Sequence, residues 1–427
     1  MASDTPASLR GQSIYQVFIR NYSPEGSFDA ALPALDAAAR MGFDIVYLAP
    51  VHPIGEEKRK GTVGSPYAIS DYRAIDPALG GEAGFRRFLD AAHEKGLKVI
   101  IDVVYNHTSP DSVLVREHPE WFWKGPEGKP APRNELWSDV VDLDHSNSEL
   151  REYLIATLEK WTRFGVDGYR CDVASLVPVE FWVAARKRCA AIRPTLWLAE
   201  STHKEFVFRM RRRGFYAASD PELHEAFDIT YDYDGRHELD DARAGRKPLS
   251  VYLHHLFLQQ CMYPATAVKA RMLENHDQPR AARHFGKGPA LRNWTAFMML
   301  AEGTFFAYMG QELAIEERPS LFESDPVDWT KGDAAFEAWF ATAHVATKAV
   351  RAREPLFDAR ELASGVVLVE RRGGTKPVAA LLNLEGRSGK LELPFPLAGT
   401  ELLSGAKVEL SGSIEIPAEP FVVELAR

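Results

Sequence analysis

Two charged side chains interrupt a segment that otherwise has the composition of a buried strand. In Gly168–Val173, Arg170 and Asp172 stand two residues apart, so the period of a strand points both toward one face. A buried charge is costly unless it is paired or takes part in chemistry. The pair is therefore either a structural ion pair or part of a catalytic site.

Acids and histidines also follow three other strand-like segments. Val99–Tyr105 runs into Asn106 and His107, Leu196–Ala199 runs into Glu200, and Arg271–Glu274 runs into Asn275, His276 and Asp277. In a (β/α)8 barrel, the carboxyl ends of all strands meet at one face, and catalytic residues lie there. The four segments together predict such a barrel with its active site at that face.

The elements that would position these residues alternate between strand and helix patterns. Helical spacing covers Phe28–Met41 and Glu82–Lys95, and Gly96 ends the second helix. Such alternation implies parallel strands joined by right-handed crossovers. The eight expected strands are Ser13–Ile19, Phe43–Ala49, Leu97–Tyr105, Val166–Val173, Leu196–Ala199, Phe227–Tyr231, Arg271–Glu274 and Thr304–Tyr308. The fold class is thus α/β, a (β/α)8 TIM barrel.

Two segments break this rhythm. Thr108–Ser146 is long, rich in Pro, Trp and charge, and follows the third strand, so we expect a short lobe over the pocket. After a helix over Asp333–Arg353, short alternating strands with Gly, Pro and Asn turns predict an antiparallel β-sandwich. The expected domains are the barrel (1–107 and 147–354, domain A), the inserted lobe (108–146, domain B) and the C-terminal β-sandwich (355–427, domain C).

Net charge, apolar content and cysteine spacing limit which partners and which cellular compartment we expect. The chain has 427 residues and a net charge of −9, which argues against nucleic-acid and anionic-membrane partners. It has no run of about 18 apolar residues, and its first residues lack the apolar core of a signal peptide, so we expect a cytoplasmic protein. The three cysteines, Cys171, Cys189 and Cys261, are widely spaced and predict reduced thiols. Strand alternation turns Cys171 away from the face that carries Arg170 and Asp172.

These motifs, in this order, resemble those of the α-amylase superfamily, the retaining α-glycosidases of glycoside hydrolase family 13. The resemblance covers nearly the whole chain. Its motifs are Asp102–His107, Gly168–Asp172, Leu198–Glu200, Glu274–Asp277 and Gly303–Glu312, with Tyr67 at the place of a stacking tyrosine.

The resemblance implies a role for each carboxylate. Asp172 is the expected nucleophile, Glu200 the expected acid/base, and Asp277 the expected ligand of sugar hydroxyls in the transition state. A retaining glycosidase needs two carboxyl groups about 5–5.5 Å apart. We expect Arg170 to lower the pKa of Asp172 and the charge of Asp172 to raise the pKa of Glu200.

The other candidate residues are expected to bind substrate or to orient its ligands. Tyr67 offers a flat face for a sugar, while His107, His276 and Arg170 can bind near it. Asp102 is expected to orient Arg170 or His107 rather than to react. Weaker candidates for substrate binding are His203, soon after Glu200, and Arg280, which is either a bridge across the pocket mouth or a solvated surface residue. Trp121, Trp123 and Trp137 could stack on further sugars or could simply fill the core of the lobe.

The chain departs from the family pattern after Asp172. Many endo-acting α-amylases continue with Lys-His, which serves the leaving-group sugar and calcium binding, whereas this chain continues with Val173-Ala174-Ser175-Leu176. Asn106 stands where the family often has a calcium ligand, but the lobe lacks an obvious set of oxygen ligands. We expect that no cofactor is required and that calcium binding, although possible, is the less favoured alternative.

Three functions remain open at this point. The resemblance favours a hydrolase of α-glucosidic bonds in maltooligosaccharides or starch-type α-glucans, acting through a covalent glycosyl-Asp intermediate. A glucosyltransferase or isomerase of the same fold would pass that intermediate to a sugar, because exclusion of water decides the outcome. A non-catalytic sugar-binding relative is also compatible with the fold, but the presence of Asp172, Glu200 and Asp277 argues against it. The expected partner is a neutral α-glucan or oligosaccharide.

Overall fold

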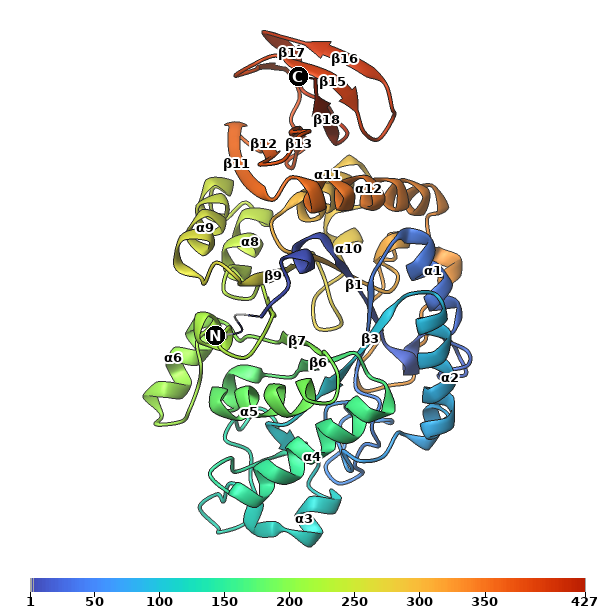
Figure 1. Ribbon diagram of the computed structural model, residues 1–427, viewed down its shortest axis with the longest axis vertical. Coiled ribbons are helices and arrows are strands. Elements are labelled where there is room, and N and C mark those ends of the chain that lie inside the picture. Colours follow the sequence, from blue (N-terminus) through green and yellow to red (C-terminus); the bar gives the residue numbers. More distant parts are fainter. Residues whose placement is uncertain (1, 3, 427) are drawn as a thin grey trace.

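A closed parallel barrel forms the centre of the molecule, in a computed structural model that describes residues 2 and 4–426 (Figure 1). The strand order around the barrel is β1-β10-β9-β8-β7-β6-β3-β2. Its strands are β1 (Ser13–Val17), β2 (Ile45–Leu48), β3 (Lys98–Val103), β6 (Gly168–Cys171), β7 (Leu196–Ala199), β8 (Ile229–Tyr231), β9 (Val268–Arg271) and β10 (Thr304–Tyr308). The predicted (β/α)8 TIM barrel is confirmed.

Helices surround the barrel. The α-helices are α1 (Pro33–Met41), α2 (Gly81–Glu94), α3 (Val113–Glu117), α4 (Ser148–Phe164), α5 (Val179–Ala190), α6 (Lys204–Arg212), α7 (Asp220–Leu223), α8 (Arg236–Arg243), α9 (Leu249–Met262), α10 (Ala281–Phe285), α11 (Pro289–Leu300) and α12 (Ala334–Arg353). Local signals set several of their ends. The Asn147 side chain accepts hydrogen bonds from the backbone of Glu149 and Leu150 at the start of α4, and Gly165 ends this helix with φ 112°.

Two predicted elements are placed wrongly. The strand expected at Arg271–Glu274 lies three residues earlier, at Val268–Arg271. Val268 and Ala270 face the barrel interior, whereas Lys269 and Arg271 point outward, so the true strand lacks the apolar composition of its neighbours. The helix expected from Phe28 begins only at Pro33, after a turn.

The barrel wall separates two cores. Inside it lie side chains such as Ile14, Tyr47, Leu198 and Phe306. Cys171 belongs to the other core, between strands and helices, and is a buried free thiol, as strand alternation predicts. Residues 170 and 172 therefore project from β6 toward the barrel interior and its carboxyl-terminal mouth.

The segment 108–146 is an irregular excursion after β3. It contains α3 and a short antiparallel pair, β4 (His107–Thr108) with β5 (Val141–Asp142). Since Asp142 pairs with His107, the excursion returns directly beside the predicted substrate-binding histidine. The lobe is thus tied to the active-site end of the barrel.

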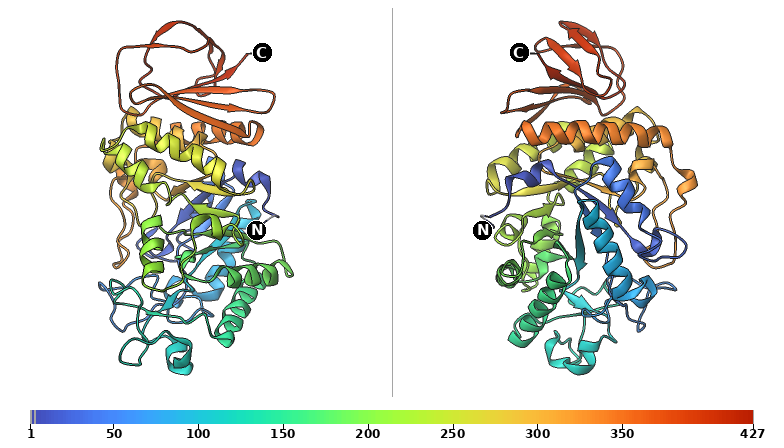
Figure 2. Two further views of the ribbon diagram at one scale, coloured as in Figure 1. Left: turned by 90° about the vertical axis from the view of Figure 1, so that its left-hand side faces the viewer. Right: turned by 45° about the vertical axis from the view of Figure 1, so that its right-hand side comes forward.

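The C-terminal segment forms the expected antiparallel sandwich. Its larger sheet has the order β11-β12-β13-β18-β15-β16, and the β14–β17 pair packs against it through a shared apolar core. Figure 2 shows this unit stacked against α12 at one end of the barrel domain. The strands are β11 (Leu356–Ala363), β12 (Val366–Arg372), β13 (Val378–Asn383), β14 (Lys390–Glu392), β15 (Leu397–Glu401), β16 (Lys407–Leu410), β17 (Ser413–Glu415) and β18 (Phe421–Leu425). Within the described part of the chain, no helix has the length and apolarity needed to cross a membrane.

Candidate active site

One buried guanidinium gathers the acids of three strands. Arg170 Nη1 donates to Asp102 Oδ1 (2.8 Å) and Oδ2 (2.9 Å) and to Asp172 Oδ1 (3.0 Å). Its Nη2 lies 3.0 Å from Glu200 Oε2. Because β3, β6 and β7 are neighbours in the barrel, residues from the ends of these strands converge. Asp102 holds Arg170, as one of the two predicted alternatives states.

The two expected catalytic carboxyls share one low-dielectric site. Burial raises the pKa of Asp172 well above its usual value, and the charge of Glu200 raises it further, while Arg170 lowers it. Burial also raises the pKa of Glu200, against the opposing charge of Arg170. Arg170 lowers the pKa of Asp172, as predicted, but burial outweighs the ion pair, so the net shift is upward. Both carboxyls therefore bind a proton more tightly than free carboxyls do.

A strained residue connects these carboxyls. Val173 has φ 34° and ψ 45°, a left-handed conformation that is rare for a β-branched residue. In this conformation its backbone N–H donates to Glu200 Oε2 at 2.7 Å. Strain of this kind costs roughly 1–3 kcal/mol and is typical of functional sites. The sequence gives no sign of it, since valine normally favours extended backbone.

A second group of polar residues lies opposite, around His276. His276 Nε2 is 2.5 Å from the Tyr67 hydroxyl and 3.0 Å from Asp277 Oδ2, and the Tyr67 and His276 rings stack with centroids 5.5 Å apart. The Tyr67 hydroxyl also lies 3.0 Å from Asp102 Oδ2. Burial tends to raise the pKa of Asp277, but His276, Arg170 and Arg318 bring it below its usual value. These charges favour the carboxylate form of Asp277, whose two oxygens can accept hydrogen bonds from hydroxyls.

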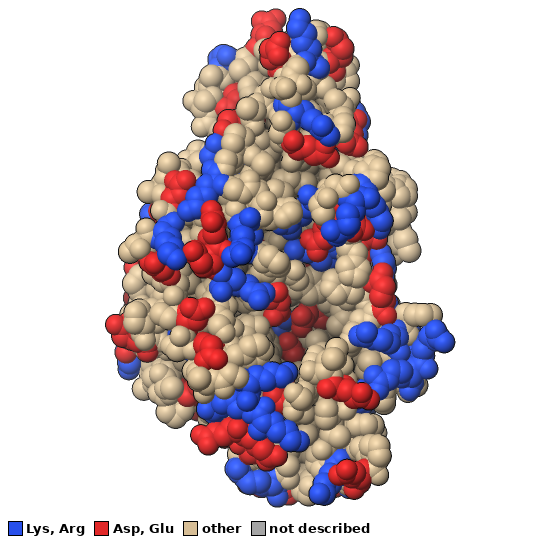
Figure 3. All heavy atoms as spheres, turned by 180° about the vertical axis from the view of Figure 1, so that it is seen from behind, with Lys and Arg blue, Asp and Glu red and all other residues tan. Residues whose placement is uncertain are grey.

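Residues of both groups line a pocket of about 260 Å³, although Arg170 and His276 lie behind its lining residues. The face in Figure 3 is hollowed near its middle, and acidic side chains lie within the hollow. Asp172, Glu200, Asp277, Tyr67 and His107 all line the pocket, as expected. Sequence reasoning missed six other lining residues: Lys60, Ser65, Asp139, Val140, Val173 and Phe322.

The lobe tryptophans divide between the two predicted roles. Trp137 lines the pocket, with its ring 5.5 Å from that of His107. Trp121 is buried and stacks on His118, so it belongs to the core of the lobe. Trp123 meets the edge of the Phe215 ring.

Asn106 is buried, and its amide lies 3.1 Å from His107 Nδ1. Nearby, Asp142 is within 3.5 Å of Arg133, and burial raises its pKa to about 6. Among the described residues, no group of three or more His, Cys, Asp or Glu side chains could hold a metal ion. Within the described part of the chain, Asp142 Oδ1 is buried and has no hydrogen-bond partner.

Two weaker candidates do not line the pocket. Arg280 lies neither across the pocket mouth nor in solvent: it is buried, donates to Glu274 Oε1 (2.7 Å) and to the Met309 carbonyl (2.9 Å), and so holds Glu274 in place. His203 stacks between Tyr233 and His237, with ring centroids 5.1 and 4.5 Å away.

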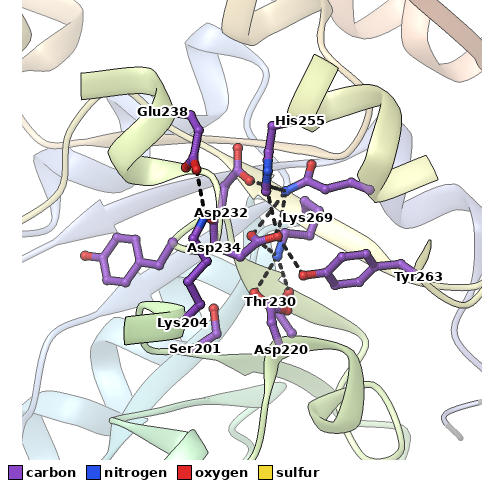
Figure 4. A network of polar contacts seen from close by, with 12 residues as sticks. Ser201, Lys204, Asp220, Thr230, Asp232, Asp234, Glu238, His255, Tyr263 and Lys269 are labelled. Atoms are coloured by element: carbon purple, nitrogen blue, oxygen red, sulfur yellow. Dashed lines mark hydrogen bonds and ion pairs between the residues drawn. The ribbon is translucent and has the colours of Figure 1, made fainter. Parts of the chain in front are cut away.

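Behind the site, a charged network fixes the turn after β8. Lys269 Nζ lies 2.6 Å from Asp220 Oδ2 and 2.8 Å from Asp234 Oδ1, and Figure 4 shows it at the centre of these groups. The turn that carries Asp234 also carries Tyr233, whose hydroxyl accepts a hydrogen bond from Asn275 at 2.8 Å. Its carbonyl oxygen lies 3.0 Å from His203 Nδ1, so Tyr233 links the segments that bear Glu200 and Asp277, a role that no motif in the sequence indicates.

Comparison with known proteins agrees with this geometry. The family described as "Alpha amylase, catalytic domain" matches residues 21–137 and 134–365. The structure superposes on an α-amylase from Lactobacillus plantarum with a TM-score of 0.93 and 39% identity, covering 98% of this chain and 99% of that one. A maltogenic α-amylase from Thermotoga neapolitana gives a TM-score of 0.87 and 32% identity, with coverage of 98% and 100%.

Relatives of other named activities are similar over part of the chain. An α-1,4-glucan:maltose-1-phosphate maltosyltransferase from Salinibacter ruber is 32% identical over 240 residues, which is 49% of this chain and 36% of that protein. A malto-oligosyltrehalose trehalohydrolase from Rhizobium is 34% identical over 204 residues, 45% of this chain and 32% of that protein. The chain thus spans only about a third of these relatives. With the barrel, the converging carboxylates and these likenesses together, the chain is a member of the α-amylase superfamily.

Proposed function

We propose that this protein is a retaining α-glycoside hydrolase that acts on α-glucosidic bonds of maltooligosaccharides or starch-type α-glucans. The observation that carries the proposal is the convergence of Asp172 and Glu200 on opposite nitrogens of the Arg170 guanidinium, at 3.0 Å each, within a pocket that Asp277 also lines. Paired carboxyls beside a sugar-sized pocket suit double displacement.

In the first step, Glu200 donates its proton to the glycosidic oxygen as Asp172 attacks the anomeric carbon. The bond to the leaving sugar breaks, and a covalent ester joins Asp172 to the retained sugar. Glu200, now a carboxylate, then takes a proton from water, whose oxygen attacks the same carbon and releases Asp172. Two inversions give net retention. Asp277 binds hydroxyls of the retained sugar, and Tyr67 offers its ring face to it.

A glycosyltransferase is the second candidate, because maltosyltransferase relatives share up to half of the chain. In that case a sugar hydroxyl would replace water in the second step. Chromatography of the products from maltotriose and maltoheptaose separates the two candidates. Shorter products alone support the hydrolase, and products longer than the substrate support the transferase.

Substitution tests the assigned roles. We expect Asp172→Asn to lower turnover by several orders of magnitude while the thermal midpoint stays near that of the wild type. Glu200→Ala should regain turnover with azide and form a glycosyl azide of retained configuration, because azide needs no general base. Asp90→Asn, an exposed site on α2, serves as the control. Near wild-type activity of the purified Asp172→Asn variant would show that the nucleophile is another residue.

We propose further that catalysis needs no cofactor. A cation of the chain, the Arg133 guanidinium, already lies 3.5 Å from Asp142 Oδ2, where a calcium ion would compete with it. Exhaustive dialysis against EDTA should leave both turnover and the thermal midpoint unchanged. A loss that calcium restores would contradict this.

A further inference from the structure

Two loops form a continuous wall at one side of the pocket. The backbone N–H groups of Val63 and Gly64 both donate to the Phe322 carbonyl at 3.1 Å. Arg20 ties the loops from behind, donating to Gly64 O (3.0 Å) and Leu321 O (2.6 Å). We call residues 60–66 with 318–323 the loop wall. Its bonds make it one unit rather than two independent loops.

The loop wall adjoins the residues that hold the retained sugar in the proposed mechanism. Tyr67 follows it directly in sequence, and Arg318 donates to the backbone carbonyl of Asp277 at 2.5 Å. The leaving-group side is the other one, since Glu200 protonates the leaving oxygen and is followed by α6. There Trp137 stacks on Phe206 of α6, with centroids 6.2 Å apart. A glucan chain that continues beyond the retained sugar therefore runs toward the loop wall.

An ion pair joins the loop wall to the lobe. Lys60 Nζ lies 2.7 Å from Asp139 Oδ1; the Asp139 side chain is 7% exposed and the Lys60 side chain 36%, so the pair lies at the edge of the pocket with Lys60 toward solvent. Lys60, Asp139 and Phe322 all line the pocket. The pocket volume of about 260 Å³ is below the roughly 300–1,000 Å³ typical of sites for drug-sized ligands. The pocket thus suits a short end of a chain rather than its middle.

We propose that the Lys60–Asp139 pair closes the retained-sugar side of the pocket, so that the enzyme accepts only the non-reducing end of an α-glucan and removes one or two sugar units at a time. This inference rests on the proposed function and adds its specificity. Lys60 and Asp139 act as specificity-determining residues: neither one contacts the reacting atoms.

The test compares maltoheptaose with maltoheptaose whose non-reducing end is blocked by a 4,6-ethylidene group. We expect wild-type enzyme to cleave the free substrate to glucose or maltose and the blocked one at least 100-fold more slowly. Lys60→Ala and Asp139→Asn should each cleave the blocked substrate at least 10-fold faster than wild type and release longer products, while Lys60→Arg should retain the wild-type pattern. Lys58→Asn is the matched control, because Lys58 is exposed in the same loop and asparagine tolerates its φ of 56°.

Each outcome has one meaning. Equal cleavage of free and blocked maltoheptaose by the wild type would overturn the inference and leave the proposed function intact. An unchanged product pattern in folded Lys60→Ala and Asp139→Asn, with folding checked by circular dichroism, would also overturn it. Absence of turnover on both substrates and on maltotriose would instead contradict the proposed function.

Discussion

At the scale of single residues, Arg170 dominates the site. Its guanidinium is buried in the barrel, contacts Asp102, Asp172 and Glu200, and lies 5.4 Å from the centroid of the Tyr231 ring. One cation cannot neutralise three carboxylates, so the group favours binding of one proton. Raised pKa values favour the protonated form that a general acid needs to protonate a leaving group.

The pH dependence of kcat/KM should reflect this proton. Glu200 must be protonated in the free enzyme, and burial together with the charge of Asp277 raises its pKa. We therefore expect activity to fall with rising pH at a midpoint above ~4.3, the ordinary value for Glu. The measurement is a pH profile of kcat/KM on maltotriose in buffers of constant ionic strength. A basic limb at or below the ordinary value would contradict the assigned electrostatics.

Tyr67 allows its hydroxyl and its ring to be tested separately. Tyr67→Phe removes bonds to Asp102 and His276, but Asp102 keeps Tyr47 and Arg170 as partners. At about 0.5–1.5 kcal/mol for each hydrogen bond, loss of the two bonds corresponds to roughly a 5–150-fold fall in kcat/KM. Tyr67→Ala also removes the stacking face and should lower kcat/KM further than Tyr67→Phe does, mainly by raising KM. Steady-state kinetics of both variants decide, and equal effects would argue against stacking.

At the scale of elements, the outer side of β9 carries charge where apolar contacts to helices are usual. Lys269 and Arg271 point outward and are paired with Asp220, Asp234 and Asp232. The network joins β8, β9, α7 and α9 at the level of the turn that bears Tyr233. It thus contributes to stability and holds part of the site wall from behind.

Removing the central cation of this network should be strongly destabilising. Lys269→Met leaves Asp220 and Asp234 buried without their cation, and breaking a buried pair from one side typically costs about 3–5 kcal/mol. Urea unfolding followed by circular dichroism gives the free energy of unfolding. Lys247→Met, at an exposed ion pair with Asp241, should leave the midpoint nearly unchanged. Equal stability of the two variants would mean that the network contributes little to the free energy of unfolding.

At the scale of the whole molecule, barrel and sandwich share one apolar core. Phe297 of α11 and Leu382 of β13 belong to the same buried cluster. Hydrogen bonds cross the boundary as well: Trp294 Nε1 donates to the Leu384 carbonyl at 3.0 Å, and Asn383 N donates to Asn293 Oδ1 at 2.9 Å. The sandwich therefore covers an apolar helix face of the barrel.

Unfolding should accordingly be a single cooperative transition. Trp294→Phe keeps most of the apolar contact but leaves the buried Leu384 carbonyl without its donor, at a cost of about 1–3 kcal/mol. Calorimetry should show a lower midpoint with one peak, in the variant as in the wild type. Two separate peaks would show that the two units fold independently.

Local sequence patterns were sufficient to predict the barrel, the sandwich and the acidic residues of the site. These features follow from local periodicity and from motifs within a few residues, and strand ends in a barrel must converge. Asp172, Glu200, Asp277, Tyr67 and His107 line one pocket for this reason. The predicted position of β9 is wrong because its outward-facing charged side chains are paired with residues of distant segments, which the local sequence does not reveal.

Contacts between side chains from distant loops could be identified only in the three-dimensional structure. The burial of Arg280 against Glu274, the contribution of Tyr233, and the Lys60–Asp139 pair each join segments that have no fixed relation in sequence. The direction of the pKa shift of Asp172 likewise depends on tertiary structure, since desolvation reflects all groups packed around the carboxyl rather than Arg170 alone. Local pattern fixes the elements and their chemistry, whereas long-range packing fixes charge state and access to the pocket.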